Sequence, residues 1–155
     1  EVERLVKKLK TCDLLSLHCN EVQGKLIGIS LSSEKGKADF VSLFPLSDEN
    51  LAKLNLLSEL FEDENITKIV YDLKTEKHIL ADYDCLVKGN CFDVQLAHYL
   101  LDSEVSHRLD FLSEKYLSYR MTDGESLIKE SSKLLQTNAL KVRKSCNDVL
   151  SDFRK

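Results

Sequence analysis

The stretch KIVYDLKTEKHILADYD, residues 68–84, decides the fold, because its pattern changes from strand to helix within a few positions. It continues a run of β-branched and apolar residues over 66–73 that is typical of a buried strand. Residues 74–84 then follow the spacing of an amphipathic helix. A strand that passes directly into a helix is typical of α/β domains, so we expect a sheet with helices against it.

Three further strand patterns precede this stretch. After a helical pattern at residues 1–10, strands are predicted over 14–19, 25–33 and 38–46. The last two are joined by a short polar turn at 34–37, which has the length of a hairpin connection. We therefore expect the first three strands to be antiparallel neighbours.

Helical patterns lie on both sides of residues 66–73. Ser47 is expected to cap a helix, and Asp93 is expected to cap another within 91–102. The buried stripe of the helix after Ser47 is predicted to consist of Leu51, Leu54, Leu57, Leu60 and Phe61. A helix over 107–117 has the stripe Leu109, Leu112 and Tyr116.

Two more helical patterns, around 127–135 and 139–153, close the chain. The sequence thus predicts an α/β domain with a mixed sheet, whose first three strands are antiparallel and which helices flank. No internal repeat or linker divides the chain, so we expect a single domain over 1–155.

The composition is that of an ordinary globular domain, with 43% hydrophobic and 31% charged residues and a net charge of −4. This charge argues against a surface that grips nucleic acid by itself. No apolar run approaches the ~20 residues of a bilayer span, and we expect a cytoplasmic protein. Five cysteines without a CxxC pair favour free thiols. A start without Met, directly in a helical pattern, suggests a piece of a longer protein.

The segments KIVYDLKTEKHILADYD and CFDVQLAHYLLDSEVSHRLDFLSEKYL closely resemble the 3'-5' exonuclease domain of family A bacterial DNA polymerases I. The shared features are the strand with a polar end, the ILA-Y turn, the FD pair, and the YLL and KYL helices. The resemblance extends from residue 14 to the NDV at 147–149. It implies the ribonuclease H-like 3'-5' exonuclease fold of the DEDD superfamily.

Active members of that family resemble one another in having four carboxylates, two of which form an Asp-x-Glu pair on the first strand. Such oxygen ligands hold two Mg ions about 4 Å apart, which activate water and stabilise the leaving oxygen. The resemblance places the catalytic-motif positions at Ser16, His18, Glu76, Val142 and Cys146. Only one of these five residues is acidic, so we expect no catalytic residue, no metal site and no cofactor in this domain.

The resemblance therefore implies a degenerate, non-catalytic exonuclease domain that serves as a structural platform in a DNA polymerase I acting in replication and repair. Its expected partner is the polymerase domain of the same chain, and DNA would be bound through the parent protein. Mg is expected only in the active site of that polymerase. We expect a monomer that does not bind membranes.

Two alternatives compete with this hypothesis. A working metal-dependent exonuclease would need rearranged ligands, and its weak candidates are Asp72, Glu76, Asp148 and Asp152. A stand-alone protein-interaction module on the same fold is the other. The candidate contacts to nucleic acid are the basic residues Lys141, Arg143 and Lys144, for which a solvated face is the competing interpretation.

Some single side chains carry explicit expectations about burial. Glu76 is expected to face solvent, where its removal would change the free energy of unfolding by only about 0.3–1 kcal/mol. Leu100 is expected in the core. His18 and Cys19 are adjacent on a strand and are expected on opposite faces, which excludes a shared zinc ion. Glu21 is expected beyond the end of that strand.

Overall fold

The computed structural model describes residues 1–121 of the chain. Two units are distinguished, residues 1–109 and the described residues 110–121, and each is treated by itself. The helices of the first unit are α1 (Val2–Leu9), α2 (Asp48–Phe61), α3 (Leu73–Ala81) and α4 (Val94–Leu101). Its strands are β1 (Leu14–Val22), β2 (Lys25–Glu34), β3 (Lys37–Ser42), β4 (Thr67–Val70) and β5 (Cys91–Asp93).

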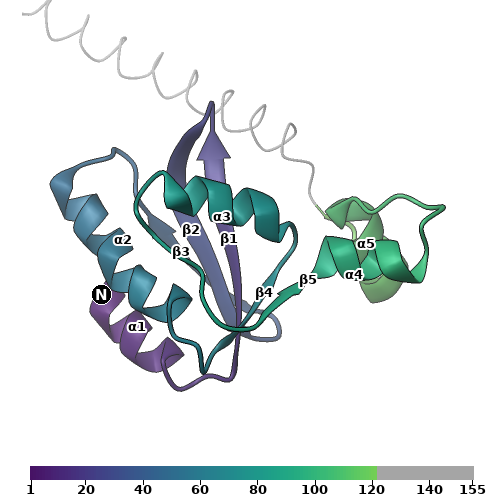
Figure 1. Ribbon diagram of the computed structural model, residues 1–155, viewed down its shortest axis with the longest axis horizontal. Helices are drawn as coiled ribbons and strands as arrows, with labels where there is room; N and C mark the ends of the chain where they lie inside the picture. Colours follow the sequence, from purple (N-terminus) through teal and green to yellow (C-terminus); the bar gives the residue numbers. More distant parts are fainter. Residues whose placement is uncertain (122–155) are drawn as a thin grey trace, which may run out of the picture. The chain divides into compact units, whose positions relative to one another are not determined.

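The strands form one sheet in the order β3-β2-β1-β4-β5 (Figure 1). Short turns join β1, β2 and β3, and these strands pair antiparallel. After α2 the chain returns on the other side of β1, where β4 pairs parallel with β1 and β5 pairs parallel with β4. The expected mixed-sheet α/β fold is therefore confirmed, while the short strand β5 was not predicted.

Alternation along β1 separates the two faces of the sheet. Leu15, Leu17 and Cys19 are buried, whereas Ser16 and His18 between them are exposed. The buried face belongs to the core that α1, α2 and α3 complete, and α1 and α2 lie side by side (Figure 1). The core residues of these helices are Val6, Leu9, Leu54, Leu57, Leu60, Phe61 and Leu80.

Side-chain caps begin three of the helices at the positions that the sequence marks. Ser47 accepts a hydrogen bond from the backbone N–H of Asn50 and so caps α2. Asp72 and Asp93 cap α3 and α4 in the same way. Each cap satisfies a backbone donor that has no partner inside its helix, which is why these residue types define the helix starts.

A buried lysine holds the segments that enter β4 and β5. Lys68 is fully buried, and its Nζ donates to the carbonyl oxygens of Asp63 and of Lys88, the latter at 2.8 Å. Burial lowers the pKa of Lys68 below its usual value. The two carbonyl contacts tie together the loops before both strands.

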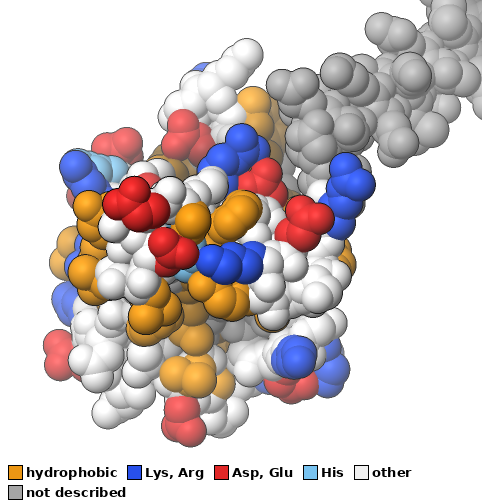
Figure 2. Space-filling model, turned by 90° about the vertical axis from the view of Figure 1, so that its right-hand side faces the viewer, with side chains coloured by type: hydrophobic (Ala, Val, Ile, Leu, Met, Phe, Trp, Pro, Cys, Tyr) orange, Lys and Arg blue, Asp and Glu red, His pale blue; other side chains and the backbone are white. Residues whose placement is uncertain are grey.

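The exposed end of α4 departs from expectation. Leu100 is 77% exposed, so the expectation that it lies in the core is wrong. The buried side chain of α4 is His98, whose Nδ1 lies 2.7 Å from Nδ1 of His107. An apolar YLL segment does not by itself tell which side of a short helix faces the interior. Figure 2 shows hydrophobic side chains beside charged ones on one face of the molecule.

In the second unit the described helix is α5 (Leu109–Leu117). Leu112 is buried as predicted, but Tyr116 is 57% exposed, so its expected place in the core is wrong. The other buried residue is Ser113, whose hydroxyl donates to the carbonyl oxygen of Tyr119 at 2.7 Å. Tyr116 lies one turn beyond Leu112, near the helix end, and burial stops within that turn.

Within the described part of the chain, no helix is both long and apolar enough to cross a membrane. The cysteines described there are the free thiols Cys12, Cys19, Cys85 and Cys91. This agrees with the sequence-based prediction, and Cys146 lies outside the described residues.

Candidate functional site

The candidate site lies where β1 loses its neighbour on one edge. β4 pairs with β1 only from Leu14 to Ser16, although β1 continues to Val22. Beyond Ser16 the backbone groups on this edge therefore need partners other than a strand. α3 begins just after β4 and supplies one of these partners.

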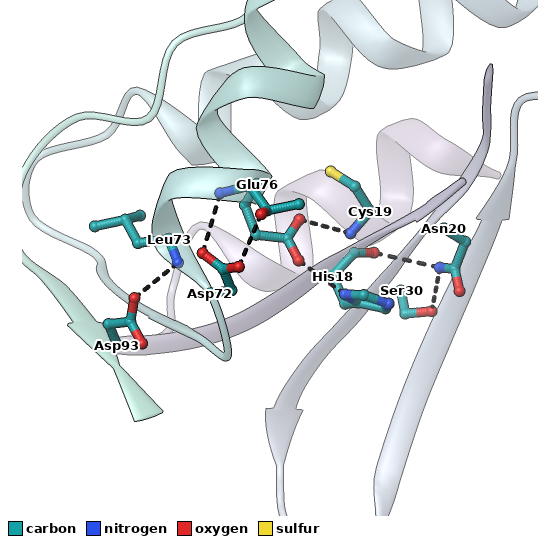
Figure 3. A network of polar contacts seen from close by, with 9 residues as sticks. His18, Cys19, Asn20, Ser30, Asp72, Leu73, Glu76 and Asp93 are labelled. Carbon is teal, nitrogen blue, oxygen red and sulfur yellow. Dashed lines mark hydrogen bonds and ion pairs between the residues drawn. The ribbon is translucent and has the colours of Figure 1, made fainter. Parts of the chain in front are cut away.

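That partner is Glu76, in the first turn of α3 (Figure 3). Its Oε2 accepts a hydrogen bond from the backbone N–H of Cys19 at 2.8 Å, and its Oε1 lies 2.8 Å from Nδ1 of His18. The residue is only 3% exposed. One carboxylate thus closes the open edge of β1 and neutralises its own charge with an imidazole.

The expectation that Glu76 faces solvent is therefore wrong. The burial of Leu80, one turn later on α3, shows that both residues belong to the helix face that lies against the sheet. The spacing of four between Glu76 and Leu80 was a signal for this face. The sequence does not reveal that Glu76 is buried, because its hydrogen-bond partners lie on a distant strand.

His18 is the basic half of the pair. Its hydrogen bond to Glu76 raises the pKa of His18 above 6.5, although partial burial opposes this change. The side chain is 61% exposed, so water screens the ion pair on one side. The adjacent Cys19 is buried, and burial and then the Glu76 charge raise the pKa of its thiol, which keeps it protonated.

The opposite burial of His18 and Cys19 confirms that they lie on opposite faces of β1 and cannot share an ion. Around His18 the exposed face carries amides and hydroxyls. Asn20 Nδ2 donates to Ser30 Oγ at 2.9 Å and to the carbonyl oxygen of His18 at 3.3 Å. Ser16 lies on the same face, opposite Ser32.

β1 continues through the register shift after Asn20 to Val22, so Glu21 is part of the strand, contrary to expectation. The unpaired residue at this shift lies on β2, between Leu26 and Gly28, and β1 itself is continuous although its last residues lack a hydrophobic alternation. Glu21 pairs with Leu26 beyond this shift, away from the position of Ser16.

Two more carboxylates near the start of α3 serve as helix caps. Asp72 accepts from the backbone N–H of Thr75 at 3.1 Å and from its hydroxyl at 2.8 Å, and these bonds, the side-chain bond foremost, lower the pKa of Asp72. Asp93 accepts from the N–H of Leu96 at 3.0 Å. It also accepts from the N–H of Leu73 at 2.8 Å (Figure 3). Asp93 thereby joins the starts of two helices, a role that sequence reasoning missed.

The donor set around β1 does not fit two magnesium ions. A two-magnesium centre needs several oxygen ligands, preferably carboxylates. At three motif positions the structure places the hydroxyl of Ser16, the imidazole of His18, and the buried Glu76, whose two oxygens already accept hydrogen bonds. Among the described residues no three His, Cys, Asp or Glu side chains come together to hold a metal ion.

The remaining predicted site residues lie outside the described residues. They are Lys141, Val142, Arg143, Lys144, Cys146, Asp148 and Asp152. Their assignments stay predictions.

The His18–Glu76 pair makes stability depend on pH. Because the pKa of His18 is raised in the folded protein, the pair stabilises the fold fully below about pH 6.5 and loses this contribution as pH rises through the folded pKa. We expect His18→Gln to be less stable than the parent by up to about 1 kcal/mol at low pH, a value limited by solvent screening. The difference should shrink in alkaline buffer.

Urea denaturation of both proteins from about pH 5.5 to about pH 9 measures this difference directly. The other histidines are the same in both proteins, so the comparison isolates the contribution of His18. A difference that is constant over the whole range would show that His18 does not carry a proton in the pair.

Comparisons with known proteins identify the family and the fold of the chain. Residues 1–144 match the 3'-5' exonuclease family. The DNA polymerase I of Borreliella burgdorferi is 27% identical over 139 residues, which is 84% of this chain. The DNA polymerase I of Caldicellulosiruptor bescii is 37% identical over 87 residues, or 56% of this chain. The matched regions span only 15% and 10% of the two relatives' own lengths.

Solved structures show the same fold. The crystal structure of Trypanosoma brucei RNase D superposes with a TM-score of 0.68 and 14% sequence identity, over 86% of this chain and 50% of the other. At this identity the likeness concerns the fold alone, which is the ribonuclease H-like α/β fold expected from the sequence. The family match over residues 1–144 and the relatives show that the chain belongs to the 3'-5' exonuclease family, in the DEDD superfamily that includes the exonuclease domains of DNA polymerase I.

Proposed function

We propose that this chain is a non-catalytic 3'-5' exonuclease domain that acts as a structural platform within a DNA polymerase I. The proposal rests on the burial and the hydrogen bonds of the Glu76 carboxylate. Glu76, the remaining acid of the first two motifs, is buried, and its two carboxylate oxygens form hydrogen bonds with Cys19 and His18. The His18 ring occupies one side of the carboxylate, and its hydrogen bond to Glu76 raises the pKa of His18, which favours a positive charge there.

The neighbouring positions support the same proposal. Ser16 is exposed on β1 where the family has a carboxylate, and its neighbours across the sheet are Ser32 and Ile69. Asp72 accepts hydrogen bonds from Thr75 and so caps the N-terminus of α3. The acids that survive here therefore stabilise the fold, which is the role of a platform.

The proposed partner is the polymerase domain of the same protein. The two relatives described above are DNA polymerases I, of which this chain spans 15% and 10%. We place the parent protein in the cytoplasm, as a DNA-directed polymerase in replication and repair, with its Mg in the polymerase active site. Contact with DNA would then occur through the parent protein.

Metal binding and nuclease activity test the proposal. We expect no saturable heat when Mn²⁺ or Mg²⁺ is titrated into the protein in a calorimeter, with or without a nucleoside monophosphate. Digestion of a single-stranded oligonucleotide should be at least about 10³-fold slower than by a family member with all four carboxylates, because several kcal/mol of metal stabilisation is missing.

Such a family member, assayed in the same buffer, is the matched control. Two ordered Mn²⁺ ions in soaked crystals would overturn the proposal. So would metal-dependent digestion that Glu76→Gln abolishes, and this result would instead favour an active exonuclease with rearranged ligands.

A further inference from the structure

A groove runs along the edge of the sheet that is furthest from β5. Its volume is about 710 Å³, and α1, α2 and β3 surround it. The apolar part of its wall comes from Val2 and Leu5 of α1 and Leu56 of α2, which are partly buried. It is separate from the Glu76 site, because none of the residues of that site lines it.

The groove follows the free edge of β3. Asp39, Phe40, Val41 and Ser42 all line it. Consecutive strand residues point to opposite faces, so a single hollow reaches all four only if it runs beside the backbone. β3 is the outermost strand of the sheet, and no strand within residues 1–121 lies next to this edge.

Hydrogen-bonding groups on this edge are available to a further strand. Leu43 donates its N–H to the carbonyl oxygen of Ile27, so Leu43 and, by alternation, Val41 direct their backbone groups toward β2. The N–H and C=O groups of Phe40 and Ser42 therefore point into the groove. An edge with such groups is a template for an added strand.

The Phe40 side chain is held beside this edge. Its ring lies against Gly28 of β2 so closely that a Cβ at Gly28 would be 2.3 Å from a ring atom. The ring is nevertheless 57% exposed. It therefore offers apolar surface on the open face of the sheet, next to an incoming strand.

The charges that line the groove indicate what kind of strand could be added to β3. Four acidic residues line the groove, Glu1, Glu3, Asp39 and Glu49, together with one lysine, Lys53, which pairs with Glu49 at 3.1 Å. Neither Glu3 nor Asp39 forms an ion pair within the described part of the chain. Pairing with a second copy would bring these acids of both copies together, which costs free energy.

We propose that this groove binds an extended, basic peptide segment of another protein by strand addition to β3. Phe40 and Ser42 would provide the backbone hydrogen bonds, and Leu5 and Leu56 would receive an apolar side chain of the segment. Lys or Arg residues on either side of that side chain would meet Glu3 and Asp39. The proposal does not depend on whether the domain is catalytic.

A heptapeptide with the order Lys-Lys-Val-Thr-Val-Lys-Lys and blocked ends is a suitable probe. We expect it to bind the full-length protein in a fluorescence anisotropy titration, with weaker binding as salt is added. The same peptide with Glu in place of Lys should not bind. On addition of the lysine peptide, hydrogen exchange should slow at the amides of Phe40 and Ser42.

Two substitutions at one position separate the backbone contact from side-chain effects. Ser42→Pro removes an N–H that faces the groove and leaves the ladder to β2 intact, so we expect at least a tenfold loss of affinity. Ser42→Ala keeps the N–H and should bind as the parent does. Asp39→Lys should weaken binding of the lysine peptide and lower its salt dependence.

Four results would overturn the proposal. The first is no saturable binding of the lysine peptide up to about 1 mM. The second is equal binding of the lysine and glutamate peptides, and the third is unchanged affinity in Ser42→Pro. Concentration-dependent dimers that Ser42→Pro abolishes in sedimentation experiments would also overturn it, because the occupant would then be a second copy of the chain.

Discussion

Replacing Glu76 by Ala is expected to lower the free energy of unfolding by about 2–4 kcal/mol. The change leaves the backbone N–H of Cys19, on a buried part of β1, without its acceptor. It also removes the carboxylate that pairs with His18 and leaves a small cavity between α3 and the sheet. Chemical denaturation at neutral pH measures the loss.

Glu76→Gln and Glu49→Ala are the matched controls. Glutamine keeps the shape and an acceptor for Cys19, so it should cost at most about 1 kcal/mol and abolish the pH dependence of the pair. Glu49 is an exposed acid in the first turn of α2, and its removal should change stability by less than about 0.5 kcal/mol. If Glu76→Ala cost no more than Glu49→Ala, the carboxylate would not be buried and paired in solution.

A core substitution in α2 should have the largest effect on stability. Leu57 is completely buried between α2 and the sheet, and Leu57→Ala is expected to cost about 2–5 kcal/mol, since both transfer and cavity terms apply. Leu100→Ala, on the exposed side of α4, should change stability by less than about 0.5 kcal/mol.

The pair of leucines compares the same chemical change at a buried and an exposed position. Denaturant titration of both variants gives the two values. A loss above about 2 kcal/mol for Leu100→Ala would show that another part of the protein covers this side of α4 in solution.

The sequence by itself determined most of the described helices and strands and their order, but not the short strand β5. The change of apolar period near residues 66–84 gave a strand followed by a helix, and the caps Ser47, Asp72 and Asp93 lie at the helix starts in the structure. These features depend on residues within a few positions of one another, so local patterns contain the information. The identity of Ser16 and His18, where the family has carboxylates, is also a property of the sequence alone.

Only the tertiary structure decided what the surviving acid does. Glu76 meets His18 across 58 positions of sequence, and its burial follows from the end of the β1–β4 ladder, which no local pattern reveals. The same is true of Leu100, whose apolar character did not determine its side of α4. Burial and pairing depend on which distant segments meet, and so the role of a carboxylate becomes visible only when the strands and helices are assembled.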